Sequence, residues 1–266
     1  MGELGPQSTV CHLLRMRAQS PRTPWPPDFP DVIVHTTVKK RDAELAYAAA
    51  KSGDAEAALT LALALVDDEA VDALTDLIAG HGITLVPVVA DETTGFNAIP
   101  DALAQVLGRR LDAPVASGEI VQTNKVGHTR APSFQRLVTP AEFEGPVEAG
   151  TTYLLVDDHV GLGGTLANLR GYICGKGGRV IGMTTLTESR EARTICLQPP
   201  TRAMLWHKHG QALDQLWQTR FGYGIDCLTD IEASNLSRQP SVAAIEDFLA
   251  QAAIEARGRG LEPAAG

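Results

Sequence analysis

Asp157 and Asp158 stand side by side in the segment 152–165, which reads Thr-Tyr-Leu-Leu-Val-Asp-Asp-His-Val-Gly-Leu-Gly-Gly-Thr. The apolar residues before the acids predict a buried strand, and the glycine-rich turn 161–164 leads into a helix that Thr165 is expected to open. Open α/β sheets place their ligands at the carboxyl ends of the strands. Glycine N–H groups and a helix N-terminus favour an anion. A ligand with vicinal hydroxyls next to a phosphate, such as ribose 5-phosphate, fits both the pair of acids and the glycine-rich turn.

Two known classes of glycine-rich nucleotide-binding loop, the Walker A loop and the Rossmann fingerprint, have a residue order different from that of this segment. A Walker A loop needs Gly-Lys-Ser/Thr, and a Rossmann fingerprint places Gly-x-Gly-x-x-Gly ahead of its acid. Here both acids precede the glycines, and no Gly-Lys-Ser/Thr triplet is present in the turn. The alternative that stays open is a tight turn between a strand and a helix that binds nothing.

This segment resembles the 5-phosphoribosyl-1-diphosphate (PRPP) signature of type I phosphoribosyltransferases, and the resemblance extends over about residues 31–190. It implies that Asp157 and Asp158 are the catalytic acids, which hold the ribose hydroxyls and, mostly through the ligand or water, a Mg²⁺ ion. It also implies a 5′-phosphate loop. The residues of that loop would be Val160, Gly161, Leu162, Gly163, Gly164 and Thr165.

Two residues depart from the family pattern. Leu162 stands where the family usually has threonine, which removes one hydroxyl donor and leaves the backbone donors. Gly161 stands where purine-salvage members carry an aspartate that handles the purine N7 proton. The resemblance therefore disfavours a 6-oxopurine as the acceptor.

The departing pyrophosphate is expected to be bound by the loop 89–97, through Thr93, Thr94 and Gly95. In the resembling family a loop at this place binds pyrophosphate, and the Gly-Phe-Asn-Ala run from Gly95 is similar to a segment of phosphoribosyltransferase-like competence proteins. The acids Asp91 and Glu92 would repel pyrophosphate unless Mg²⁺ lies between them. The alternative is an ordinary loop with a solvated acidic tip.

A mobile lid is expected at 123–136, just before the motif strand. Lysine, histidine and arginine concentrate there in a chain of formal net charge −9, and such a local change of sign favours the entry of a polyanion. Lys125 and Arg130 are the predicted pyrophosphate contacts. An ordinary surface loop is the alternative.

The acceptor is expected near the aromatic residues Trp217, Phe221 and Tyr223, because aromatic faces could stack on a planar ring. The equally strong alternative is that these rings anchor a helical appendage on the core.

Composition excludes several other classes of protein. No long basic stretch supports a nucleic-acid interface, and the four cysteines lie too far apart to predict a zinc site or a disulfide framework. The longest apolar run, 57–66, is too short to span a bilayer, and the first residues lack the pattern of a signal peptide. We expect a cytoplasmic homodimer that contacts neither membrane nor nucleic acid.

Strands that alternate with helices predict an α/β fold with a mostly parallel central sheet flanked by helices, as in type I phosphoribosyltransferases. Residues 1–30 are expected to be a flexible leader, 31–190 the PRPP-binding domain, and 191–266 a helical C-terminal hood or appendage. Strands are predicted at 31–37, 83–89, 119–122, 153–156 and 179–186, and helices at 41–51, 54–66, 69–79, 100–111, 211–220 and 242–256.

The predicted function is the Mg²⁺-dependent transfer of 5-phosphoribosyl from PRPP to a small nitrogenous acceptor, with release of pyrophosphate. The alternatives are a non-catalytic regulator that binds PRPP or a nucleotide, and an accessory protein that acts through a partner.

Overall fold

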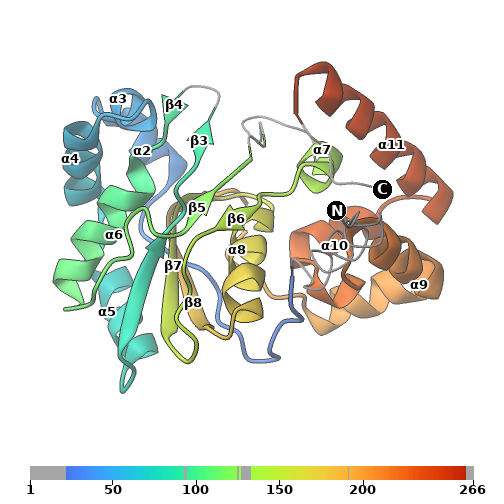
Figure 1. The fold of residues 1–266 in the computed structure, drawn as a ribbon, viewed down its shortest axis with the longest axis horizontal. Coiled ribbons are helices and arrows are strands. Elements are labelled where there is room, and N and C mark those ends of the chain that lie inside the picture. Colours follow the sequence, from blue (N-terminus) through green and yellow to red (C-terminus); the bar gives the residue numbers. More distant parts are fainter. Residues whose placement is uncertain (1–21, 93–94, 125, 127–132, 191, 262–266) are drawn as a thin grey trace, which may run out of the picture.

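The computed structural model describes residues 22–92, 95–124, 126, 133–190 and 192–261 (Figure 1). A parallel four-stranded sheet lies at its centre, in the order β1-β8-β7-β2. The strands are β1 (Ile33–Val34), β2 (Ile83–Pro87), β7 (Thr152–Val160) and β8 (Arg179–Glu188). Residues 113–122 run along the outer side of β2, where Leu85 and Val89 form single parallel bridges with Val115 and Val121.

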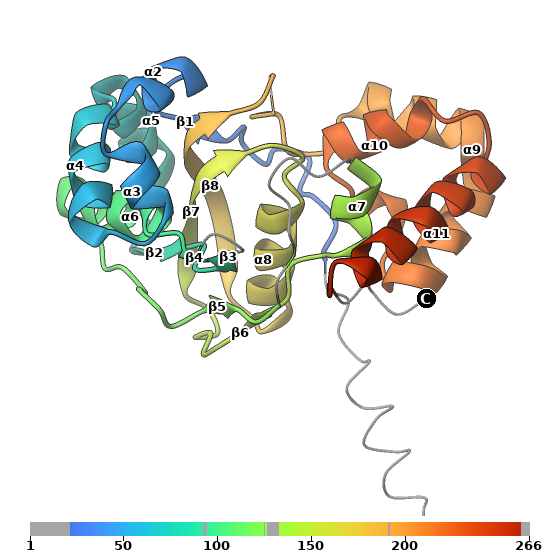
Figure 2. The ribbon, with the colours of Figure 1, turned by 90° about the horizontal axis from the view of Figure 1, so that it is seen from above.

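The two faces of the sheet are covered by different helices, as Figure 2 shows. Because successive side chains of a strand point to opposite faces, Leu154 of β7 packs in the core cluster shared with α4 and α6, whereas Leu155 packs in the cluster shared with α8. The helices are α2 (Val38–Ala43), α3 (Tyr47–Lys51), α4 (Ala55–Leu65), α5 (Asp68–Ile78), α6 (Ile99–Arg110) and α8 (Gly164–Gly175).

The C-terminal residues form a helical unit beyond α8, built from α9 (Pro199–Phe221), the 3₁₀ turn η1 (Ile225–Cys227), α10 (Asp230–Ser237) and α11 (Val242–Gly258). The predicted α/β fold and the helical C-terminal appendage are therefore confirmed. The helix α9 is broken at Gly210, whose φ of 53° and ψ of −145° are not helical.

The helix α7 (Ser133–Val138) packs with the C-terminal unit, although it precedes the motif strand in the sequence. Leu137 and Val138 belong to the same core cluster as Trp217, and Phe134 stacks on Phe248 of α11 with ring centres 5.1 Å apart. The predicted boundary at residue 190 therefore does not describe the packing, because contacts between distant segments define this unit.

Residues 22–30 are an ordered strap, which corrects the prediction of a flexible leader for this part of the chain. Arg170 of α8 donates hydrogen bonds to the Thr23 and Pro24 carbonyls, and the Trp25 indole N–H donates to the Leu228 carbonyl at 2.8 Å. These contacts to α8 and to the segment before α10 fix the strap. Residues 1–21 lie outside the described residues.

Local differences from the predicted elements concern short segments. The helix expected over 41–51 is divided into α2 and α3 by the extended residue Glu44. The strand expected over 119–122 is only β5 (Val121–Gln122), which pairs antiparallel with β6 (Phe143–Glu144) outside the central sheet. A further hairpin joins β3 (Asp91–Glu92) to β4 (Gly95–Phe96). In the described part of the chain, no helix is both long and apolar enough to cross a membrane.

Candidate functional site

The two acids lie within β7 near its carboxyl end. The strand continues to Val160, which corrects the expectation that it ends at Val156. The neighbour β2 ends earlier, at Pro87, whereas β8 still pairs with the acids, and Asp157 stands opposite Thr185. Asp157 and Asp158 are 8% and 7% exposed, so a ligand would meet carboxylates that are largely withdrawn from water.

A lysine from a distant helix neutralises one of the acids. The Nζ atom of Lys51, the last residue of α3, lies 2.8 Å from Oδ2 of Asp158. Burial and the adjacent Asp158 carboxylate raise the pKa of Asp157 well above its usual range. Burial acts on Asp158 in the same direction, but the charge and hydrogen bond of Lys51, together with a hydrogen bond to Asp157, outweigh burial and lower the pKa of that carboxyl. Asp158 is therefore the more acidic member of the pair.

A polar network from β8 and α2 supports the backbone of Asp158. The Thr187 hydroxyl donates to the Asp158 carbonyl at 3.3 Å and accepts a hydrogen bond from Arg41 Nη1 at 3.0 Å. His159 Nδ1 and Nε2 lie 2.8 Å from the hydroxyls of Thr187 and Ser189. Burial lowers the pKa of His159, so its neutral imidazole fits these two hydroxyl partners.

The glycine-rich turn places the N-terminus of α8 directly after β7. The helix begins at Gly164, one residue before the predicted Thr165, and Gly163 is its N-cap with φ of 78°. No side chain caps this end within the described residues, and the first N–H groups of a helix have no partners inside it. The turn therefore leaves backbone donors for an anion at the end of β7.

The C-terminal unit packs closely on the other side of this turn. A Cβ on Gly163 would lie 3.0 Å from Ile195 and 3.1 Å from Thr229, and a Cβ on Gly164 would lie 2.9 Å from Glu232 Oε1. The Thr229 hydroxyl donates to the Leu162 carbonyl at 2.6 Å. Glycine is thus required at 163 by both its positive φ and its lack of space.

Arg136 of α7 lies at the beginning of the turn. A Cβ on Gly161 would be 2.8 Å from Arg136 Nη1. Burial lowers the pKa of this half-buried guanidinium. The sequence placed Arg136 among the cations of the predicted lid without choosing it as a pyrophosphate contact, and it assigned no site role to Lys51. Arg136 falls within the cation-rich stretch 123–136, which was a signal for it, whereas Lys51 is 107 residues from Asp158 and had none.

The predicted acceptor residues are not arranged to stack on a ligand. Trp217 is 0% exposed, and Phe221 and Tyr223 are each 8% exposed. The Trp217 and Phe221 ring centres lie 4.7 Å apart inside the core of the C-terminal unit. In this structure the three rings present no free face to an acceptor, and they pack inside the C-terminal unit together with α7.

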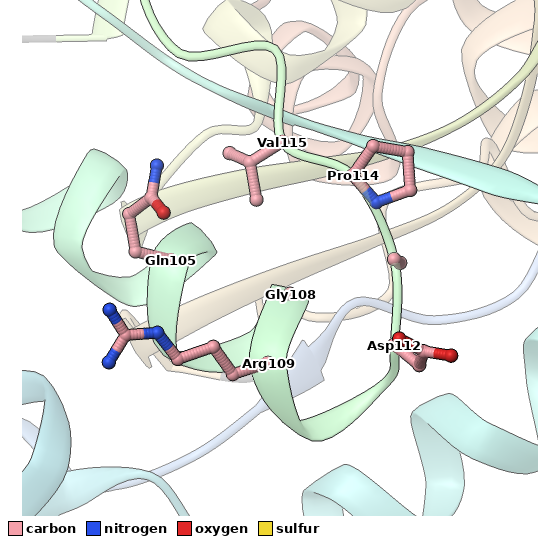
Figure 3. A pocket seen from close by; sticks show the side chains of 7 residues that line it. Gln105, Gly108, Arg109, Asp112, Pro114 and Val115 are labelled. Atoms are coloured by element: carbon pink, nitrogen blue, oxygen red, sulfur yellow. The ribbon is translucent and has the colours of Figure 1, made fainter.

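Only one of the predicted pyrophosphate contacts can be placed. Gly95 begins β4, and its backbone pairs with Glu92. Thr93, Thr94, Lys125 and Arg130 lie outside the described residues. A shallow pocket of about 500 Å³ lies between the end of α6 and residues 112–115, and its lining includes none of the predicted site residues (Figure 3).

No group of three or more His, Cys, Asp or Glu side chains is placed to hold a metal ion in the described part of the chain. Asp157 and Asp158 could share in binding Mg²⁺ only if oxygens of a ligand or of water completed its coordination.

Comparisons with known proteins give relatives that cover most of this chain. Protein TraN of Escherichia coli is 43% identical over 242 residues, which are 91% of this chain and 54% of TraN. An uncharacterized protein of Haemophilus influenzae is 40% identical over 155 residues, 58% of this chain and 34% of that protein. The chain thus spans about half and a third of the lengths of these two relatives. No protein-family model matches the sequence.

Among solved structures, a purine phosphoribosyltransferase from Pyrococcus horikoshii is 16% identical with a TM-score of 0.27, over 46% of this chain and 83% of that one. UMP synthase of Leishmania donovani is 15% identical, also with a TM-score of 0.27, over 70% of this chain and 36% of that one. Likenesses this distant support no functional conclusion, which must come from the residues of this chain.

Proposed function

We propose that this chain binds PRPP at the end of β7 and transfers its phosphoribosyl group to a small nitrogenous acceptor. The observation that carries the proposal is the direct succession of the buried pair Asp157–Asp158 and the uncapped N-terminus of α8 behind the Gly163 turn. Carboxylates accept hydrogen bonds from hydroxyls, and a helix N-terminus binds phosphate. Ribose 5-phosphate presents these two groups at its opposite ends.

Different residues would bind different parts of PRPP. Asp158, the more acidic member of the pair, accepts from ribose hydroxyls, and Asp157 completes their binding. Backbone donors from Gly163 to Thr165 bind the 5′-phosphate. Arg136, which lies beside Gly161, adds a positive charge on the same side of the turn.

In the proposed reaction a nitrogen lone pair of the acceptor forms a bond to C1 of the ribose while the bond from C1 to the pyrophosphate oxygen breaks. Pyrophosphate leaves with that electron pair, and the acceptor nitrogen loses its proton to water. The buried acids favour the positive charge that develops on the ribose ring. Mg²⁺, when bound with the substrate, would offset the charge of the pyrophosphate. Thr93, Thr94, Gly95, Lys125 and Arg130 remain the predicted pyrophosphate contacts.

The donor site can be tested by titration calorimetry with PRPP and Mg²⁺. The double variant Asp157→Asn/Asp158→Asn should lose measurable binding, because amides cannot replace the charge of the pair. The control Asp72→Asn/Asp76→Asn removes two acids from the exposed face of α5 and should bind like the wild type. Unchanged affinity in the first double variant would refute the site assignment.

The burial of Trp217, Phe221 and Tyr223 favours a second candidate, a regulator or accessory protein that binds PRPP without transfer, because these three rings have no exposed face on which an acceptor could stack. Release of pyrophosphate from PRPP separates the two candidates. An enzyme should release it when a mixture of bases and heterocyclic amines is added, and Asp157→Asn/Asp158→Asn should abolish the release. Tight PRPP binding without pyrophosphate release in the presence of any tested acceptor would favour the regulator.

A further inference from the structure

We propose that Thr229, at the N-terminus of α10, is a positioning residue that aims the phosphate-binding backbone of the Gly163 turn. This inference rests on the proposed function. It gives the C-terminal helical unit a role at the donor site, although Trp217, Phe221 and Tyr223 of that unit are buried.

The first step of the argument is the geometry of one peptide group. The carbonyl of Leu162 and the N–H of Gly163 belong to the same peptide plane and point in opposite directions in a trans peptide. The described residues contain no cis peptide bond. Because the Thr229 hydroxyl donates to the Leu162 carbonyl at 2.6 Å, that carbonyl faces the C-terminal unit. The Gly163 N–H is therefore turned away from this unit.

The second step is that the hydroxyl of Thr229 is itself held in place. Thr229 and Glu232 form a capping box, in which the Glu232 N–H donates to Thr229 Oγ1 at 3.2 Å and the Thr229 N–H donates to Glu232 Oε2 at 3.0 Å. Because a hydroxyl has one proton to donate and its oxygen already accepts from Glu232, that proton is available for Leu162. Thr229 is 1% exposed, so water does not compete for it.

The third step is that the turn is confined on the same side. The Thr229 methyl carbon would lie 3.1 Å, and Ile195 3.0 Å, from a Cβ on Gly163. The methyl group therefore fills the space beside the glycine while the hydroxyl fixes the peptide. These two contacts can be separated by substitution, since valine keeps the branched shape and serine keeps the hydroxyl.

The test compares Thr229→Val with Thr229→Ser by calorimetry with ribose 5-phosphate, which probes the turn without the pyrophosphate contacts. Loss of one aimed donor to a charged phosphate should weaken binding by about tenfold or more in Thr229→Val, and Thr229→Ser should retain most of the wild-type affinity. Ser241→Ala is the matched control, because Ser241 caps α11 through the Ala244 N–H. This variant should lose a helix cap without any change in affinity.

The outcomes distinguish this inference from the proposed function. Binding by the wild type with equal affinity in Thr229→Val would overturn the positioning role and leave the donor site intact. If the wild type does not bind, the proposed function fails, and the NMR chemical shifts of the backbone amides at 162–165 still test the role of Thr229. Those shifts should change more in Thr229→Val than in Thr229→Ser and stay unchanged in Ser241→Ala, and unchanged shifts in Thr229→Val would refute the inference.

Discussion

The buried ion pair between Arg22 and Glu232 should contribute strongly to the stability of the fold, because it joins the strap 22–30 to α10. Arg22 Nη1 lies 2.6 Å and Nη2 3.0 Å from the two carboxylate oxygens of Glu232, and the side chains are 3% and 2% exposed. Arg22 Nε also donates to Asn168 of α8 at 2.6 Å. A single substitution would therefore leave a charge buried with no opposite charge.

The perturbation is Arg22→Met, which keeps much of the apolar stem and removes the guanidinium. Breaking a buried pair in this way costs about 3–5 kcal/mol of the free energy of unfolding. For a chain of this length, roughly 2–4 °C of Tm corresponds to each kcal/mol, so the melting temperature should fall by about 6–20 °C. Thermal unfolding followed by circular dichroism or calorimetry measures this shift.

Two further variants make the result specific. Arg110→Met removes a pair of similar length, 2.7 Å to Asp68, whose side chains are 45% and 85% exposed, and such a pair is worth only about 0–1 kcal/mol. The double variant Arg22→Met/Glu232→Gln should be more stable than Arg22→Met alone, because no unpaired charge remains buried. If Arg22→Met shifted the melting temperature no more than Arg110→Met does, the pair would not be what fixes the strap.

Two other predictions follow from contacts near the sheet and the turn. Gly163→Ala should reduce both the melting temperature and the PRPP affinity more than Gly80→Ala does. Both glycines have φ of 78°, but only at 163 would a Cβ meet the side chains of Ile195 and Thr229. Equal effects of the two substitutions would show that this close packing is unimportant. Burial lowers the pKa of His35 from 6.5 to about 4. As the pH falls from 6.5 to 4, the unfolded chain therefore binds a proton at this histidine while the folded chain does not. Stability should then decrease by about 3 kcal/mol from this residue, and His35→Gln should show a correspondingly smaller loss between pH 6.5 and 4 in urea titrations.

Much of the fold could be predicted because its signals are local. The helices α4, α5 and α11 begin next to Asp54, Asp67 and Ser241, whose side chains accept hydrogen bonds from the first turn. Such caps, together with the spacing of apolar residues, indicate helix starts directly. The break between α2 and α3 could not be predicted in this way, because no glycine or proline marks it in the sequence.

The candidate site was only partly predictable. The acids and the glycine turn are contiguous in the sequence, and the predicted order of strand, acids, turn and helix is present in the structure, apart from the longer strand. The aromatic residues of α9 gave a misleading signal. Trp217 could either stack on a ligand or fill a core, and only the packing of α7, α10 and α11 around it decides for the core.

The sequence by itself determined the local structure of the segment 152–165, because strand alternation, glycine conformation and a helix start each depend on neighbouring residues. Only the tertiary structure decided what surrounds that segment. Lys51 reaches Asp158 across 107 residues, Thr229 reaches Leu162 across 67, and Glu232 reaches Arg22 across 210. No sequence spacing encodes such contacts, since they form only where segments from distant parts of the chain pack against one another.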